Sequence, residues 1–248
     1  MLAGRLFALE LQAVLSYTKY SNGGKMKLKL IQNREETKGV RTFIFEPEQP
    51  IDWQPGQYMH YVLDHANADD RGTERWFTIA SAPFEKHIQI TTRFDGEIES
   101  SFKKAMDAME PGDSIEADGP KGSFILQEGE HHHVFIAGGI GITPYRSMIV
   151  QLAHDKQQPR IDLLYANKDD NFVFKEELEG LQAINSEFKI LEFVDKRIAE
   201  PDLEKYFSDK SAVFYLSGPR SMVESYEHLF ADRGIEKTAV MTDYFPGY

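Results

Sequence analysis

At residues 134–144 the chain reads Val134-Phe135-Ile136-Ala137-Gly138-Gly139-Ile140-Gly141-Ile142-Thr143-Pro144. An apolar, strand-like run leads into glycines, and Pro144 suits the first turn of a helix, where its missing N–H costs nothing. We predict a strand over 134–137 and a helix over 144–154. Backbone N–H groups at the start of such a helix favour a phosphate. A glycine-rich turn alone is weak evidence for a phosphate site, because the same residues also build an ordinary tight strand–helix connection.

Strand and helix patterns alternate from here to the C-terminal region. Further strands are predicted at 161–165, 190–194 and 212–216, and further helices at 174–183 and 221–233. This alternation indicates a parallel sheet with helices on both faces.

The preceding part of the chain has a different pattern, in which short β runs are separated by turns. Strands are predicted at 28–31, 42–45, 58–62, 76–79 and 88–92, with one helix at about 98–109. Aromatic and β-branched residues fill these runs, and many short strands at this spacing favour an antiparallel barrel or sandwich. The change of pattern predicts two domains, 26–128 and 129–248.

Residues 1–25 are mildly basic and carry a broken apolar run that ends at Ser21-Asn22-Gly23-Gly24. Two interpretations stay open, because short amphipathic segments are weakly diagnostic. The segment is an extension outside the fold, from an upstream start codon, or a short helix packed on the barrel. The run is a weak signal-peptide core, and no stretch of the chain is long and apolar enough to span a membrane.

The composition excludes several classes of site. The 248 residues include no cysteine, which removes disulfides, cysteine nucleophiles and cysteine-ligated iron–sulfur clusters from this chain. This fits a reducing cytosol, and we expect a cytoplasmic protein. The formal net charge of −12 makes nucleic acid a poor candidate partner. His131-His132-His133 cannot all face one metal from regular structure, so we expect a solvated loop and no metal site.

A second segment, Arg75-Trp76-Phe77-Thr78-Ile79-Ala80-Ser81-Ala82-Pro83, lies in a predicted strand. A fixed guanidinium can hold a pyrophosphate through two parallel hydrogen bonds. Phe77 should share a strand face with Arg75, because side chains alternate with period two. An aromatic ring and the Thr78 hydroxyl could then meet a planar ring system. Taken alone, the segment also fits an ordinary core strand with a surface arginine.

Together these segments carry a family resemblance. Arg75-Trp76-Phe77-Thr78 resembles the Arg-x-Tyr-Ser/Thr flavin motif of the ferredoxin–NADP reductase family, and residues 138–144 resemble its pyridine-nucleotide pyrophosphate loop. Further segments follow in that family's order: Pro55-Gly56-Gln57, Gly119-Pro120-Lys121-Gly122-Ser123-Phe124, Ser217-Gly218-Pro219-x-x-Met222 and Asp243-Tyr244-Phe245. The resemblance covers about residues 26–248. It implies an antiparallel flavin-binding β-barrel followed by a Rossmann-like, parallel-sheet nucleotide-binding domain.

The resemblance assigns roles at the flavin. Arg75 would hold the flavin phosphate, Phe77 would lie against the isoalloxazine, and Thr78 would hydrogen-bond near its central-ring nitrogen. A glycine and a serine would contact the pyrophosphate, but this chain has one residue more than the family between them, so the serine is Ser100 or Ser101. The residues expected at the flavin are Arg75, Trp76, Phe77, Thr78, Gly96, Ser100 and Ser101.

It also assigns roles at the nucleotide. The residues expected at the pyrophosphate and nicotinamide of NAD(P)H are Gly138, Gly139, Gly141, Thr143, Pro144, Gly218, Pro219 and Met222. Lys168 could hold the 2′-phosphate of NADPH, but Asp169 and Asp170 follow it and would repel that group, so NADH and NADPH both stay open. Phe245 would shield the flavin face until nicotinamide displaces it, and Asp243 or Thr78 could help to protonate the flavin.

Three positions depart from the family pattern. Phe77 replaces the usual tyrosine, so stacking is kept and a hydroxyl contact is lost. Ser217 replaces a cysteine that often precedes Gly-Pro, and Asp243 stands where glutamate is common.

The resemblance implies a flavin-dependent NAD(P)H oxidoreductase, with FAD favoured over FMN. Hydride would pass from NAD(P)H to the flavin, and single electrons would pass to a separate acceptor. That acceptor is a ferredoxin, a flavodoxin or a small molecule, since this chain has no cysteine for a cluster of its own. The alternatives are a non-catalytic flavin- or nucleotide-binding subunit of a larger complex, and a two-domain protein with vestigial sites.

Overall fold

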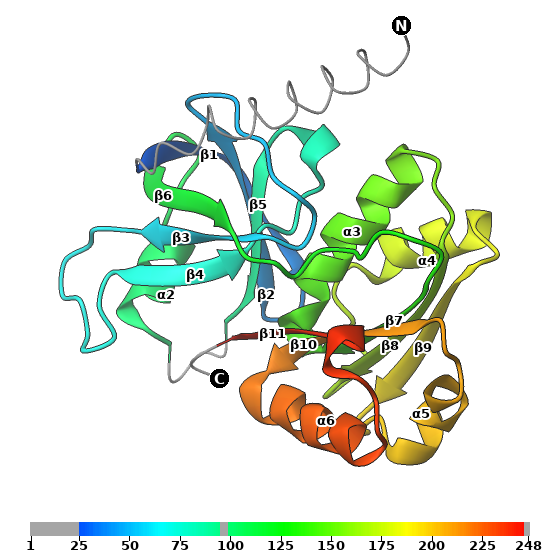
Figure 1. The fold of residues 1–248 in the computed structure, drawn as a ribbon. Coiled ribbons are helices and arrows are strands. Elements are labelled where there is room, and N and C mark those ends of the chain that lie inside the picture. Colours follow the sequence, from blue (N-terminus) through cyan, green and yellow to red (C-terminus); the bar gives the residue numbers. More distant parts are fainter. Residues whose placement is uncertain (1–24, 95–98, 246–248) are drawn as a thin grey trace, which may run out of the picture.

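The computed structural model describes residues 25–94 and 99–245. Figure 1 shows two domains side by side, an antiparallel barrel (blue to green) and an α/β domain (green to red). The expectation about residues 1–25 falls outside the described residues except for Lys25, which pairs with Glu116 at 3.3 Å. None of the helices in the described ranges is both long and apolar enough to cross a membrane.

The first domain is an antiparallel sheet that curls into a half-barrel (Figure 1). Its elements are β1 (Met26–Thr37), β2 (Val40–Pro47), β3 (Tyr58–Val62), β4 (Glu74–Thr78), the 3₁₀ turn η1 (Pro83–Glu85), β5 (Ile88–Arg93), α2 (Ser101–Asp107) and β6 (Ser114–Lys121). The strand order is β4-β3-β6-β1-β2-β5.

Alternation of apolar and polar residues builds the barrel core. In β1, Leu28 and Leu30 are buried while Lys27 and Lys29 are exposed, as a strand with one solvated face requires. Helix α2 places Phe102 and Met106 in the same core cluster. The helix therefore packs against the inside of the curled sheet.

The second domain is a parallel sheet with the strand order β11-β10-β7-β8-β9. Its elements are β7 (His132–Gly138), η2 (Gly139–Ile142), α3 (Thr143–His154), β8 (Arg160–Asn167), α4 (Lys175–Ile184), β9 (Phe188–Val194), α5 (Glu200–Phe207), β10 (Ala212–Pro219), α6 (Arg220–Asp232), η3 (Lys237–Ala239) and β11 (Val240–Phe245).

Helices cover both faces of this sheet (Figure 1). On one face, Phe135 packs with Tyr145 of α3 and Leu178 of α4. On the other, Phe214 packs with Phe230 of α6. A sheet buried on both faces explains the continuous apolar run of β7, and it confirms the predicted barrel followed by a Rossmann-like domain.

Besides the short 3₁₀ turns, two strands and one α-helix are absent from the sequence prediction, namely β6, β11 and α5. Strand β6 contains Gly119-Pro120, which reads as a turn, although the strand pairs with β1 and β3. Helix α5 is short and β11 carries polar residues, so neither has a strong periodic signal.

The prediction of a solvated histidine loop is wrong for His132 and His133, which are buried in β7. His132 tolerates burial because its Nδ1 lies 2.9 Å from Asp209 Oδ2 and its Nε2 lies 3.6 Å from Asp162 Oδ1. Charged partners offset the loss of water. Within the described residues, no group of histidine and acidic side chains has the arrangement of a metal site.

Candidate functional site

Arg75 and Phe77 lie on one face of β4, as the period of two predicts. The guanidinium of Arg75 is 5.4 Å from the ring centroid of Phe102, and the ring of Phe77 is 6.0 Å from the same centroid. Phe102 belongs to α2. The flavin-motif residues therefore face the helix whose first turn carries the two predicted serines.

The guanidinium of Arg75 is held on one side and unsatisfied on the other. Its Nη1 donates to the carbonyl oxygens of Arg71 at 2.7 Å and Glu74 at 2.5 Å. Its Nη2 is buried and has no hydrogen-bond partner within the described part of the chain. Burial lowers the pKa of Arg75. An unpaired buried donor is costly, so this atom fits an anionic acceptor such as a flavin phosphate.

Trp76 and Thr78 lie on the opposite face of β4. The Trp76 ring is 46% exposed, and its centroid is 4.3 Å from that of His60 and 5.4 Å from that of Tyr58. Thr78 is buried and pairs with Tyr58 in the strand register. Thus Trp76 does not share the face on which Arg75 presents its unpaired donor.

The two predicted serines have local partners at the start of α2. Ser100 caps the helix, because its Oγ accepts from Lys103 N at 3.3 Å. Ser101 N donates to Asp69 Oδ2 at 2.8 Å, and Asp69 N donates to Ser101 Oγ at 2.9 Å. The Ser101 N–H, with Arg71, lowers the pKa of Asp69 to about 2. Asp69, which sequence reasoning missed, therefore occupies a donor that the resemblance assigns to a phosphate. Gly96 lies outside the described residues.

The glycine loop between β7 and α3 contains two kinds of glycine. Gly139 has φ +54°, and a Cβ placed there would meet only Asn167 Oδ1 at 3.8 Å, so this position is open. A Cβ at Gly141 would lie 2.2 Å from the carbonyl oxygen of Ser217. Gly141 is thus required for the close approach of η2 to β10, whereas Gly139 leaves backbone accessible to a ligand. The Thr143 hydroxyl donates to Ile140 O at 3.1 Å and tightens the turn.

The ends of β7 and β10 meet around Met222. A Cβ at Gly138 would lie 2.5 Å from Met222 Sδ, and one at Gly218 would lie 2.8 Å from Met222 Cε. The same Cβ at Gly138 would be 3.1 Å from Pro219 Cδ. The structure therefore brings together four residues that the sequence analysis placed at the nucleotide, all at the carboxyl edge of the sheet, where open α/β sheets bind ligands.

Strand β11 adds the C-terminal motif to this edge. Ser217 is opposite Asp243 in the β10–β11 register, and Pro219 is opposite Phe245. Ser217 Oγ donates to Asp243 Oδ2 at 3.4 Å. Burial raises the pKa of Asp243 to about 6, against the opposing effect of this hydrogen bond. The backbone of Phe245 thus lies beside Pro219; its side chain is not among those that the structure describes.

Lys168 follows the end of β8, beside a tightly bonded turn. Asn167 Nδ2 donates to the carbonyl oxygens of Asp169 and Asn171, both at 3.1 Å. Arg93 Nη2 of the barrel donates to Asn167 Oδ1 at 3.4 Å. Arg93 is a second cation at this edge that sequence reasoning missed, because its position depends on how the domains pack. An apolar groove between α3 and α4, lined by Leu152 and Ile184 among others, lies at the other end of α3 from the glycine loop.

Comparisons with known proteins agree with this fold. Residues 135–228 match the model of the oxidoreductase NAD-binding domain. The flavohem-like FAD/NAD binding domain of nitric oxide dioxygenase from Vibrio cholerae superposes with a TM-score of 0.76 at 20% identity, covering 90% of this chain and 99% of that one. The ferredoxin–NADP+ reductase of Plasmodium falciparum gives 0.74 at 15% identity, covering 89% and 96%. The fold is that of ferredoxin–NADP reductase-like proteins. This confirms the resemblance that the motifs carry.

Curated proteins similar to this chain include an NADH-quinone reductase component and a flavohemoprotein. One component of the Na(+)-translocating NADH-quinone reductase of Pseudomonas aeruginosa is 26% identical over 235 residues, covering 84% of this chain and 56% of the relative. The flavohemoprotein of Bacillus subtilis is 23% identical over 235 residues, covering 87% and 58%. The chain therefore spans a little over half the length of these two relatives.

Proposed function

We propose that this chain is an FAD-dependent NAD(P)H oxidoreductase that delivers electrons to a separate acceptor. One observation carries the proposal: the barrel segment that contains the predicted flavin motif is hydrogen-bonded across the domain boundary to α3, the helix that follows the predicted glycine loop. Ser147 Oγ of α3 donates to Ser81 O at 2.6 Å, three residues beyond Thr78. Two motifs that lie far apart in sequence are thereby held side by side, as ring-to-ring hydride transfer requires.

On the flavin side, Arg75 would bind a phosphate of FAD through its unpaired Nη2. Phe77 and Thr78 would contact the ring system, and Ser100 or Ser101 the pyrophosphate. Ser101 can do so only if its N–H leaves Asp69. When bound, FAD supplies hydride acceptance from NAD(P)H and release of single electrons.

On the nucleotide side, the open backbone at Gly139 and the start of α3 at Thr143 and Pro144 would receive the pyrophosphate. Gly218, Pro219 and Met222 would border the nicotinamide. Lys168 would meet the 2′-phosphate in the case of NADPH. We assign catalytic roles to Thr78, to Phe245 and to Asp243, where burial raises the pKa of the carboxyl to about 6.

For the acceptor we propose a one-electron carrier of the ferredoxin or flavodoxin class, or a small molecule. The absence of cysteine supports a separate carrier, because a cysteine-ligated iron–sulfur cluster has no ligands in these 248 residues.

The test is the visible spectrum of the purified protein, followed by anaerobic addition of NADH and of NADPH in separate samples. We expect a flavin spectrum that bleaches, and the nucleotide that reduces it faster identifies the preferred donor. A colourless protein that neither FAD nor FMN reconstitutes would contradict the proposal. Steady turnover with ferricyanide would distinguish an enzyme from a non-catalytic redox subunit.

A further inference from the structure

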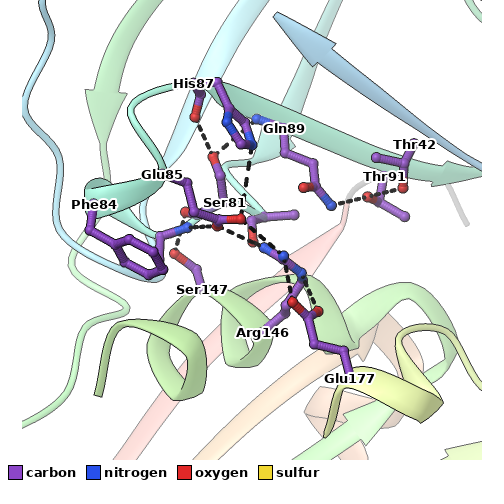
Figure 2. A network of polar contacts seen from close by, with 12 residues as sticks. Thr42, Ser81, Phe84, Glu85, His87, Gln89, Thr91, Arg146, Ser147 and Glu177 are labelled. Carbon is purple, nitrogen blue, oxygen red and sulfur yellow. Dashed lines mark hydrogen bonds and ion pairs between the residues drawn. The ribbon is translucent and has the colours of Figure 1, made fainter. Parts of the chain in front are cut away.

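A buried arginine joins the two domains at the point where both cofactor motifs end. Arg146 lies in the first turn of α3, is 4% exposed and points toward the barrel segment that follows β4 (Figure 2). Its guanidinium touches Ala80 and Glu85 of the barrel and Glu177 of α4. The side chain therefore connects three elements from both domains.

All five N–H groups of Arg146 have acceptors. Nη1 donates to Ala80 O at 2.8 Å and to Glu85 Oε2 at 3.0 Å. Nη2 donates to Glu85 Oε1 at 3.1 Å and to Glu177 Oε1 at 2.8 Å. Nε donates to Glu177 Oε2 at 2.7 Å. Glu177, in the same α/β domain as Arg146, fixes the plane of the guanidinium through Nε and Nη2. The Nη1 and Nη2 groups also reach across the boundary to Ala80 and Glu85 of the barrel.

Charge strengthens this arrangement. Burial alone would raise the pKa of Glu85, but the hydrogen bonds and charge of Arg146 outweigh it and lower the pKa. Burial would lower the pKa of Arg146, but the two carboxylates raise it. Arg146 therefore forms a charged bidentate pair with Glu85 and another with Glu177. Such pairs add geometric specificity as well as energy.

The barrel segment that receives Arg146 is itself fixed. Glu85 Oε2 accepts from Ala82 N at 2.6 Å, and Ser81 O accepts from Trp53 Nε1 at 3.2 Å as well as from Ser147. Farther along α3, Gln151 Oε1 accepts from Phe84 N at 3.2 Å. Because the acceptors do not move independently, the position of the guanidinium sets the position of the whole segment.

We propose that Arg146 is a positioning residue that fixes the separation between the flavin and the nicotinamide. Ala80 lies two residues after Thr78, and Arg146 lies three residues after Thr143, so the path between the two motifs through Arg146 is short and rigid. The inference rests on the proposed function, because it concerns the geometry of hydride transfer between the two ligands.

Lysine at this position would keep the charge and lose the geometry. An ammonium is a point charge with three donors and has no planar fork, so it cannot bind Glu177, Glu85 and Ala80 O together in this arrangement. The variant Arg146→Lys therefore removes the positioning while it preserves the buried positive charge that the two carboxylates need. Glu85→Gln is a second variant, which removes the carboxylate charge from the contact across the boundary and keeps an amide oxygen that can accept from Ala82 N.

The first test measures the separation of the domains without any cofactor. The chain has no cysteine, so Ile31→Cys in β1 and Ile184→Cys in α4, at positions 46% and 72% exposed, provide two unique spin-label sites. Double electron–electron resonance should give one narrow distance distribution for the parent and a broadened or displaced one for Arg146→Lys. Arg233→Lys is the control, because Arg233 pairs with Glu200 and Glu204 inside the α/β domain. An unchanged distribution in Arg146→Lys would overturn the inference.

The second test measures flavin reduction by stopped flow under anaerobic conditions. For Arg146→Lys and Glu85→Gln we expect the limiting rate to fall by about 10- to 100-fold, because small misplacements of reacting groups cost this much. The nucleotide Kd and the flavin content should stay within about twofold of the parent, since neither residue is a predicted ligand of either cofactor. If the flavin of the parent is reduced and the variants have the same limiting rate as the parent, the inference about Arg146 is overturned and the proposed function stands. A parent whose flavin neither nucleotide reduces would overturn the proposed function as well.

Discussion

Ser217 and Asp243 lie opposite each other at the carboxyl ends of β10 and β11, and the Ser217 hydroxyl donates to the Asp243 carboxyl at 3.4 Å. The carboxyl is mostly shielded from water, and its pKa is raised to about 6. This edge also carries Gly218 and Pro219, so a group that titrates near neutral pH lies within the predicted nicotinamide site.

Ionisation of Asp243 should therefore destabilise the protein as the pH rises. The folded pKa of about 6 exceeds the ordinary 3.8, so the carboxyl contributes no penalty below about pH 4. Between pH 4 and 6 the unfolded chain loses its proton first, and folding stability falls. In Asp243→Asn this loss is absent. We expect the free energy of unfolding of the variant, minus that of the parent, to grow by on the order of 2 kcal/mol from pH 4 to pH 7.

Urea unfolding of the cofactor-free proteins at pH 4, 5, 6 and 7 provides the measurement. All other groups titrate in both proteins, so the difference isolates Asp243. A difference that stays constant over this range would show that the carboxyl is ionised at its ordinary pKa.

Two glycines should respond oppositely to alanine. A Cβ at Gly141 would lie 2.2 Å from Ser217 O, which belongs to backbone and cannot rotate away, whereas a Cβ at Gly180 in α4 meets nothing within 4 Å. Gly141→Ala should lower the free energy of unfolding by at least about 2 kcal/mol. Gly180→Ala should raise it by about 0.5–1 kcal/mol, because glycine is unfavourable inside a helix. Thermal and urea unfolding measure both; a tolerated Gly141→Ala would mean that η2 is not packed against β10.

Local patterns predicted how the candidate site residues lie on their own strand or loop, but they did not predict which residues of other elements contact them. The shared face of Arg75 and Phe77 follows from the two-residue period of a strand, and the glycine loop follows from an apolar run that ends in glycines and a proline. The pairing of Ser217 with Asp243 does not follow from local pattern, because it depends on the order of strands in the sheet. Asp69 and Arg146 were missed for the same reason, since their partners lie in other elements.

His132 shows how a partner distant in sequence changes the expected burial. Three consecutive histidines are polar, and they follow Glu128 and Glu130, so the local sequence indicates a charged, solvated loop. The carboxylates of Asp162 and Asp209 come from β8 and from the segment before β10, and they make burial of the ring acceptable.

The same cluster should make the protein sensitive to acid. Burial alone would raise the pKa of Asp162, but interactions with His132, Tyr206 and Lys205 outweigh it and hold the pKa well below its usual range. A lowered folded pKa means that this stabilisation is complete above about pH 4 and is lost as the pH falls further. Asp162→Asn should cost about 2–4 kcal/mol at pH 7 and should flatten the decline of stability between pH 4 and pH 2.5. The exposed Asp52→Asn is the control, measured by thermal unfolding across this range. An equally steep acid decline in Asp162→Asn would exclude this cluster as its source.

Removal of the Arg75 guanidinium should weaken flavin binding more than it weakens the fold. Its Nη2 has no protein partner among the described residues, so the hydrogen bond that it offers to a phosphate is one that the cofactor-free protein does not use. A charge-assisted hydrogen bond contributes about 1.5–3 kcal/mol, so Arg75→Ala should raise the Kd for FAD by at least about 10-fold.

Arg34→Ala is the control, because it removes an arginine that pairs with Glu36 elsewhere in the barrel. Quenching of FAD fluorescence on titration gives the Kd, and thermal unfolding of the cofactor-free protein accounts for the lost bonds to the carbonyl oxygens of Arg71 and Glu74. Equal affinity for FAD in Arg75→Ala and the parent would place the flavin phosphate somewhere other than the unpaired donor of Arg75.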